Sequence, residues 1–218
     1  MSRKRKITIF LLCVLILAST FIQSLAADSQ ELNNKRYFSM ENNTEVIIEE
    51  NALNIPQEHV EQLAKENPNS LVTISEYVKA EPEISPRFVI ATVITKKTIT
   101  KPRYVYGDYF VASVGKGATF TLQTEWSKTL SFFVTHSDAK APLQLSDSIT
   151  KTYSVGVTFT GPPENSSYNS RSYRVRFFAE DGTYEGYRVH DTGQTLNISG
   201  TFRNPIEYSA YTVDSNIN

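Results

Sequence analysis

Three histidines are the only imidazole side chains that the chain offers for acid–base catalysis: His59, His136 and His190. Histidine is the usual general base near neutral pH, and it needs a partner within hydrogen-bonding distance. His136 and His190 are each followed closely by an aspartate, but neighbouring residues of a strand point to opposite faces of a sheet. Adjacency in the sequence therefore does not make a catalytic dyad, and we predict that the protein is not an enzyme.

The linear motifs of well-known active sites are also missing from the sequence. There is no Gly-x-Ser-x-Gly elbow of a serine hydrolase, no glycine-rich phosphate loop, no His-Glu-x-x-His helix and no calcium loop. We therefore expect no cofactor and no metal ion. A pair of carboxylates has no linear signature, so a hydrolase with an unrecognised carboxylate site stays open as an alternative. Its candidate acids are Glu125, Asp138, Glu164, Glu180 and Asp191.

The first 27 residues have the pattern of a secretory signal peptide. Basic residues at 3–6 precede an apolar run at about 7–22, and small residues follow. The run is short for a membrane-spanning helix of about 20 residues, so we expect cleavage near 26–28 and secretion. The segment resembles the export signals of Gram-positive bacteria, which implies location only. The single cysteine, Cys13, lies inside it, so we expect a mature protein without disulfides.

Charge and aromatic content change near residue 86. Residues 28–86 carry 12 Asp and Glu against 4 Lys and Arg, whereas residues 87–218 carry 11 against 14. All nine glycines and 20 of the 25 aromatic residues lie beyond this point. We predict a boundary here between an acidic segment with one short helix, at about 55–67, and a core-forming domain. The acidic segment is either a permanent solvated arm or a pro-segment that masks the basic domain.

The aromatic half alternates apolar and polar residues with a period of two, which is typical of strands with one buried face. The clearest runs are 118–134, where even positions are mostly apolar, and 148–160, where odd positions other than Lys151 are apolar. Shorter runs of the same kind follow up to residue 213. We therefore predict an antiparallel β-sandwich of about eight strands over residues 87–218, with a barrel as the alternative architecture.

Several strand boundaries follow from breaks in these patterns. The run at 118–134 is expected to bend near Lys128, and Asp181-Gly182 is expected to form a hairpin turn. Asn204-Pro205 is expected to separate two strands. Residues 87–94 are apolar on both faces, which suits a central strand or a buried edge.

A cluster of basic residues with neighbouring tyrosines is a candidate binding site. It consists of Lys96, Lys97, Lys101, Arg103, Tyr104 and Tyr106. Basic charge attracts an anionic surface, and tyrosine rings suit an interface. We therefore predict a secreted, non-catalytic binding module whose partner is an anionic wall polymer, a glycan, a membrane surface or another protein, and not a nucleic acid. The other tyrosines that support a binding function are Tyr109, Tyr168, Tyr184 and Tyr187. A second basic patch could form from Arg171, Arg174, Arg176 and Arg188 if their strands pair.

The alternative function is that of a membrane-active toxin, either pore-forming or bacteriocin-like. The runs 118–134 and 148–160 are joined by a link of 13 residues. Strands of about 10 residues with one apolar and one polar face are what a transmembrane hairpin requires. Its lipid-facing residues would be Phe120, Leu122, Trp126, Leu130, Tyr153, Val155, Val157 and Phe159. A sandwich strand with one solvated face has the same pattern, so the sequence does not decide between the two functions.

Overall fold

The computed structural model describes residues 34–80, 92–136, 148–189 and 193–217. The predicted signal peptide, the boundary near residue 86 and most of the link between the two alternating runs lie outside the described residues. No helix in the described part of the chain is long and apolar enough to cross a membrane.

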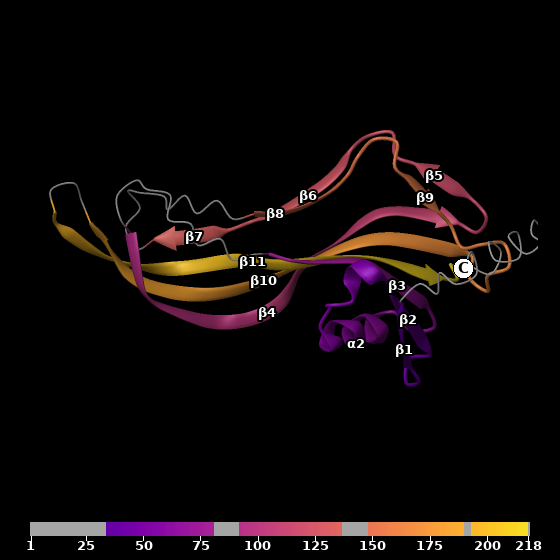
Figure 1. Cartoon of the computed structure of the whole chain (residues 1–218), viewed down its shortest axis with the longest axis horizontal. Helices are drawn as coiled ribbons and strands as arrows, with labels where there is room; N and C mark the ends of the chain where they lie inside the picture. The colour runs from indigo at the N-terminus through magenta and orange to yellow at the C-terminus, as the bar shows by residue number, and fades with distance from the viewer. Residues whose placement is uncertain (1–33, 81–91, 137–147, 190–192, 218) are drawn as a thin grey trace, which may run out of the picture. The chain divides into compact units, whose positions relative to one another are not determined.

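Seven strands form one mixed sheet. Six of them follow the order β1-β2-β3-β11-β10-β4, and the seventh, β7, pairs with residues 200–203 of β11, which β3 does not reach (Figure 1). The strands are β1 Lys35–Ser39, β2 Thr44–Ile48, β3 Leu71–Lys79, β4 Thr92–Gly115, β7 Phe133–His136, β10 Ser170–Val189 and β11 Thr195–Ser215. The prediction of a largely β protein is confirmed. The sheet is not wholly antiparallel, however, because β2 and β3 run parallel. A helix connects these two strands, as a parallel crossover requires.

Three strands of this sheet are much longer than the usual 3 to 10 residues, since β4 has 24, β10 has 20 and β11 has 21. The predicted turn at Asp181-Gly182 is wrong, because β10 runs through it. Gly182 serves close packing instead: a Cβ there would lie 2.5 Å from the Phe202 ring. β11 also continues through Asn204-Pro205, with a shift in register opposite Phe178 and Ala179.

β4 lies at the edge of the sheet. Its first residues, from Thr92, belong to the segment for which we predict a central strand or a buried edge. That prediction is wrong for the described residues, because Val93 and Ile94 are exposed. β4 is also longer than β10, which it pairs with, and several register shifts absorb the difference.

The segment 35–80 completes the hydrophobic core on one face of the sheet. The predicted helix is present as α2, Gln57–Glu66, preceded by the short η1, Glu50–Ala52. It begins after Pro56, and Asn67 ends it by donating from its side-chain amide to the Leu63 carbonyl at 2.8 Å. Residues of this core are Val46, Ile48, Val60, Leu63, Ala64, Val72, Ile74, Tyr211 and Val213.

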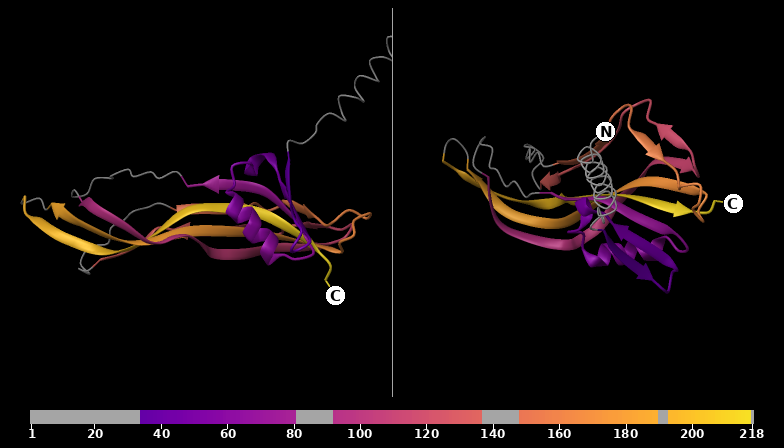
Figure 2. Two further views of the ribbon diagram at one scale, coloured as in Figure 1. Left: turned by 90° about the horizontal axis from the view of Figure 1, so that it is seen from below. Right: turned by 45° about the vertical axis from the view of Figure 1, so that its right-hand side comes forward.

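Two small sheets cover the other face of the long strands (Figures 1 and 2). They are formed by β5, Thr119–Thr121, with β9, Thr158–Thr160, and by β6, Trp126–Ser131, with β8, Ser148–Tyr153. The long strands β4, β10 and β11 therefore lie between these small sheets and α2.

Candidate functional site

The two small sheets are successive ladders of one hairpin. Thr119 lies opposite Thr160 in the first ladder, and Trp126 lies opposite Tyr153 in the second. The segments between the ladders, 122–125 and 154–157, have equal length, so the register is the same on both sides. The strand bends in this interval and not near Lys128, where the sequence predicts it. We refer to residues 119–136 with 148–160 as the hairpin.

One face of the hairpin carries only hydroxyl side chains within the two ladders, and all of them are exposed. The cross-strand pairs are Thr119–Thr160, Thr121–Thr158, Ser127–Thr152, Thr129–Thr150 and Ser131–Ser148. Three pairs are hydrogen bonded through their hydroxyl groups, at 2.8 to 3.0 Å. This arrangement gives the hairpin an outer surface that is polar but nearly uncharged. We call it the hydroxyl face.

The opposite face of the hairpin is mainly apolar and packs on the sheet. Leu130 and Ile149 are buried in a cluster with Phe177 of β10 and Tyr208 of β11. Further along, Leu122 and Phe159 are buried in a second cluster with Ala112 and Val114 of β4. Trp126, Tyr153 and Val157 are half-buried at these clusters. Of the eight predicted lipid-facing residues, only Phe120 and Val155 are largely exposed, at 42% and 63%.

The hairpin is stacked on the sheet and has few strand-pairing contacts with it. Among the described residues only β7 pairs with the main sheet, through four residues opposite 200–203 of β11. Trp126 donates from Nε1 to the Phe110 carbonyl at 3.2 Å, and Tyr173 donates to the Thr160 carbonyl at 2.7 Å. Two open grooves of about 300 and 310 Å³ lie along Phe133 and Arg203 at the β7 end of the described hairpin.

Two lysines interrupt the apolar face next to the Trp126–Tyr153 pair. Lys128 lies directly opposite Lys151 in the β6–β8 ladder. Lys151 forms an ion pair with Glu76 of β3, and Lys128 lies over the Tyr109 ring, with Nζ 5.2 Å from the ring centre. Burial and the charge of Glu76 raise the pKa of the neighbouring Tyr153 to about 12. Both lysine charges are thus compensated by side chains of the main sheet.

The basic cluster predicted as a binding site lies along the edge strand β4, where carboxylates meet most of its charges. Lys96 pairs with Glu185 at 3.2 Å, and Lys97 pairs with Glu180 at 2.9 Å. Arg103 pairs with Glu207 and with Glu58. Lys101 and Pro102 also lie on this strand, and lysines and proline hinder pairing of an exposed edge with other strands.

The two tyrosines of the cluster also have contacts inside the protein. The hydroxyl of Tyr104 donates to Asp181 at 2.9 Å, and Lys101 lies 3.6 Å above the Tyr104 ring. Tyr106 faces the guanidinium of Arg203 at 5.1 Å. The cluster therefore does not present a row of unpaired cations.

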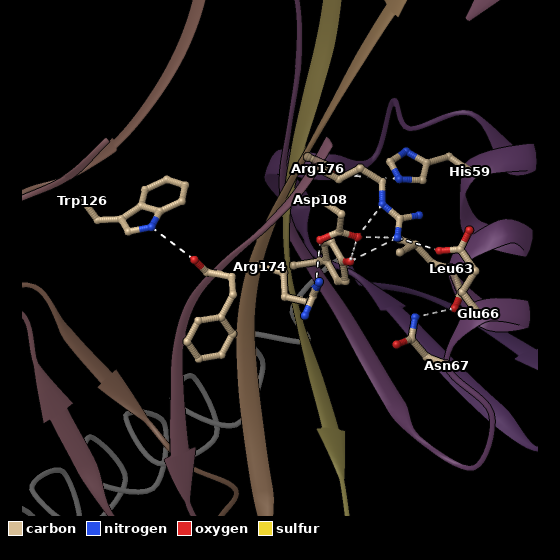
Figure 3. A network of polar contacts seen from close by, with 11 residues as sticks. His59, Leu63, Glu66, Asn67, Asp108, Trp126, Arg174 and Arg176 are labelled. Carbon is tan, nitrogen blue, oxygen red and sulfur yellow. Dashed lines mark hydrogen bonds and ion pairs between the residues drawn. The ribbon is translucent and has the colours of Figure 1, made fainter. Parts of the chain in front are cut away.

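Two of the four other predicted arginines, Arg174 and Arg176, take part in a polar network on the α2 side of the sheet (Figure 3). Arg174 and Arg176 both donate to Asp108 at 2.9 Å, and Arg176 also reaches Glu66 of α2 at 2.6 Å. Burial alone would raise the pKa of Asp108, but the Tyr211 hydroxyl and the two guanidinium groups hold it below its usual value. Arg171 is similarly paired with Asp214.

His59 lies beside this network and is a structural residue (Figure 3). Its ring is fully buried, packs edge-on against Phe178 at 4.4 Å and has Nε2 3.4 Å from the Ser209 hydroxyl. Burial, and then the charges of Arg103 and Arg176, lower the pKa of His59 to about 3. The imidazole is therefore neutral near pH 7, but no substrate can reach it. The side chain of His136, together with His190, Asp138 and Asp191, lies outside the described residues.

The sequence could reveal the alternation of the hairpin strands but not the partners of the charged residues. In the described ranges, no group of three or more His, Cys, Asp or Glu side chains is placed to hold a metal ion. Glu125 is exposed on the hairpin, and Glu180 is paired with Lys97. Tyr184 is buried, and Tyr109 packs against Phe177.

Comparison of the chain with protein families, with curated proteins and with solved structures finds no match.

Proposed function

We propose that this is a secreted, membrane-active, pore-forming protein whose hairpin leaves the sheet and enters a lipid bilayer. The observation that carries the proposal is the division of the hairpin into a polar face, which bears only hydroxyl side chains within the two ladders, and a largely apolar face, both held in one register. In a membrane the hydroxyl face would meet water and the apolar face would meet lipid.

The length of the hairpin fits this role. Trp126 and Tyr153 form a pair suited to a membrane interface, and at about 3.4 Å per residue the stretch 127–136 beyond Trp126 extends over roughly 34 Å when straight. A transmembrane strand needs about 9 to 11 residues for a hydrocarbon layer about 30 Å thick. Each large apolar side chain, such as Leu130 or Ile149, contributes about 1.5 to 3 kcal/mol when it leaves water. Lipid would replace the sheet as the apolar environment, so insertion would keep this contribution.

The resting protein, in this proposal, is a two-layer β-sandwich of hairpin and main sheet. Release of the hairpin requires loss of face-to-face packing and of the short β7–β11 ladder, but the pairing of β4, β10 and β11 can stay intact. We expect residues 35–80 to remain with the protein as well. Their removal would unpair β11 from β3 and expose Tyr211 and Val213.

Several copies must act together. A single hairpin has two outer edges with unpaired N–H and C=O groups, which the hydrocarbon layer does not tolerate. The outer edges of β6 and β8 have no strand partner among the described residues. Pairing of β6 from one copy with β8 from the next would satisfy these groups. A closed ring of hairpins would enclose a channel lined by the hydroxyl face.

Release of dye from vesicles tests this function. The secreted protein is added to neutral and to anionic vesicles that contain a small dye or a large dextran, before and after limited proteolysis near Arg87. A pore of fixed width releases the dye and retains the dextran. If neither vesicle type releases dye under either condition, the proposal is wrong. The mass of the secreted species shows in the same samples whether it starts near Ala27 or near Arg87.

The non-catalytic binding module stays a prediction with a test of its own. The ion pairs of Lys96, Lys97 and Arg103 leave less free positive charge on β4 than the sequence suggests. Retention of the protein on cell-wall polymer or glycan, without any release of dye from vesicles, would favour this function over the pore.

A further inference from the structure

The hydroxyl face has a single charged residue in the described part of the hairpin, Glu125. Positions 119, 121, 127, 129 and 131 of this face are Thr or Ser, and Gln123 and Glu125 continue the same alternation between the two ladders. Resting on the proposed function, we infer that Glu125 determines which ions pass through the channel. The permeating species it favours are cations.

The carboxylate of Glu125 is free to act on ions in solution. The residue is exposed, and neither an ion pair nor a hydrogen bond joins its side chain to any other described residue. The contrast with Glu76, Glu180, Glu185 and Glu207 is clear, because each of these is paired with a lysine or an arginine. A ring of copies would bring several free carboxylates around one opening, and rings of Asp or Glu favour cations.

The neighbours of Glu125 indicate its depth. Trp126 and Tyr153 form a cross-strand pair on the apolar face, and Lys128 and Lys151 form the next pair on that face. Tryptophan and tyrosine gather at the membrane–water interface, and lysine on a lipid-facing surface is tolerated there because its amino group reaches water. These two pairs therefore belong at an interface. Glu125 precedes Trp126, so its carboxylate lies at the channel mouth.

The strand that pairs with β6 has no charged residue opposite Glu125. With the register of the two ladders continued through the interruption, Glu125 lies opposite Ser154. Lys128 and Lys151 are on the other face, away from the channel. The remaining charged residues of the region, Asp138, Lys140 and Asp147, belong to the segment outside the described residues. Glu125 is thus the residue whose charge we expect to dominate at this mouth.

The test is the current that the full secreted chain carries across a planar bilayer under a KCl gradient. We expect the permeability ratio of K⁺ to Cl⁻ to exceed one for the unchanged protein, to fall toward one in Glu125→Gln and to fall below one in Glu125→Lys. Glu185→Gln is the matched control. It removes the same charge from an exposed carboxylate on β10, outside the hairpin, and should leave the ratio unchanged.

Channels whose ratio is the same in the unchanged protein, Glu125→Gln and Glu125→Lys would overturn the role of Glu125 and leave pore formation intact. A protein that carries no current at all would overturn both proposals. Release of dye by each variant in parallel shows whether the substituted proteins still assemble.

Discussion

Glu76 on β3 holds Lys151 on β8 in an ion pair, and so links the sheet to the hairpin. The second carboxylate oxygen of Glu76 accepts a hydrogen bond from Tyr208 of β11. Burial and this hydrogen bond raise the pKa of Tyr208 above its usual value, so the hydroxyl remains a donor. Lys151 also faces Lys128, and like charges directly opposite in a ladder repel. Glu76 therefore offsets an unfavourable pair only while the hairpin rests on the sheet.

Glu76→Gln should make the hairpin easier to release. The substitution leaves Lys151, which is mostly buried, without its carboxylate, and breaking such a pair costs about 1 to 3 kcal/mol. We expect a lower midpoint of urea unfolding and faster release of dye at equal protein concentration. Glu185→Gln breaks the exposed pair with Lys96 and should change stability by less than about 0.5 kcal/mol. Slower release by Glu76→Gln would contradict this role.

Trp126 is the only tryptophan of the chain and reports directly on the hairpin. In the resting protein its indole donates to the Phe110 carbonyl and lies 5.7 Å from the Tyr153 ring. We expect its fluorescence to be quenched by lipids brominated on the acyl chains once vesicles are added. Because Trp126 is assigned to the interface, bromine near the headgroup should quench more strongly than bromine at the chain end. Trp126→Phe supplies the background emission, and quenching by neither lipid would show that the hairpin stays outside the bilayer.

His59 should make the resting fold sensitive to acid. Above pH 6.5 the imidazole is neutral in the folded and unfolded chains, so it does not alter stability. Below pH 6.5 the unfolded chain takes up a proton that the folded protein accepts only near pH 3, because the pKa of His59 is lowered to about 3. Stability is therefore lost as the pH falls from 6.5 toward 3, by about 2 to 3 kcal/mol at pH 4.5.

Urea unfolding at pH 7 and pH 4.5 measures this loss. In His59→Gln the difference between the two pH values should shrink by about the same 2 to 3 kcal/mol, although the variant is less stable than the unchanged protein at pH 7. Equal pH dependence of the two proteins would mean that His59 is protonated as readily in the fold as in the unfolded chain.

Local patterns revealed the hairpin strands, because the period-two alternation of 118–134 and 148–160 depends only on neighbouring residues. The shared register of the two ladders could not be read from the sequence, since a link of 13 residues does not fix how its ends align. β1 and β2 were not predicted, because each is only five residues long and shows too short an alternation to stand out in the sequence. They are stabilised by tertiary packing, with Val46 and Ile48 buried beside α2.

The basic cluster shows why a site was harder to predict than a strand. Lys97 and Arg103 look like free charges in the sequence, but their partners Glu180 and Glu207 lie on β10 and β11, far along the chain. The glycine of Asp181-Gly182 was similarly misread as a turn residue, although it makes room for the Phe202 ring. Both errors concern contacts between strands that sequence spacing does not encode.

The most direct test of the account is a reversible lock between the hairpin and the sheet. Thr135 of β7 and Thr201 of β11 are cross-strand partners whose hydroxyl oxygens are 2.6 Å apart, so a cysteine at each position suits a disulfide. The only natural cysteine lies in the predicted signal peptide, so the new pair should have no competitor in the mature protein. Cysteines at Ser113 and Ser172, which are partners within the main sheet, provide the matched control.

The measurement is release of dye from vesicles by each cysteine variant, oxidised and then reduced. The account predicts that the oxidised Thr135→Cys/Thr201→Cys protein releases no dye, that reduction restores release, and that the Ser113→Cys/Ser172→Cys protein is active in both states. Full release of dye by the oxidised Thr135→Cys/Thr201→Cys protein, with the disulfide verified by mass, would show that the hairpin does not have to leave the sheet and would contradict the account.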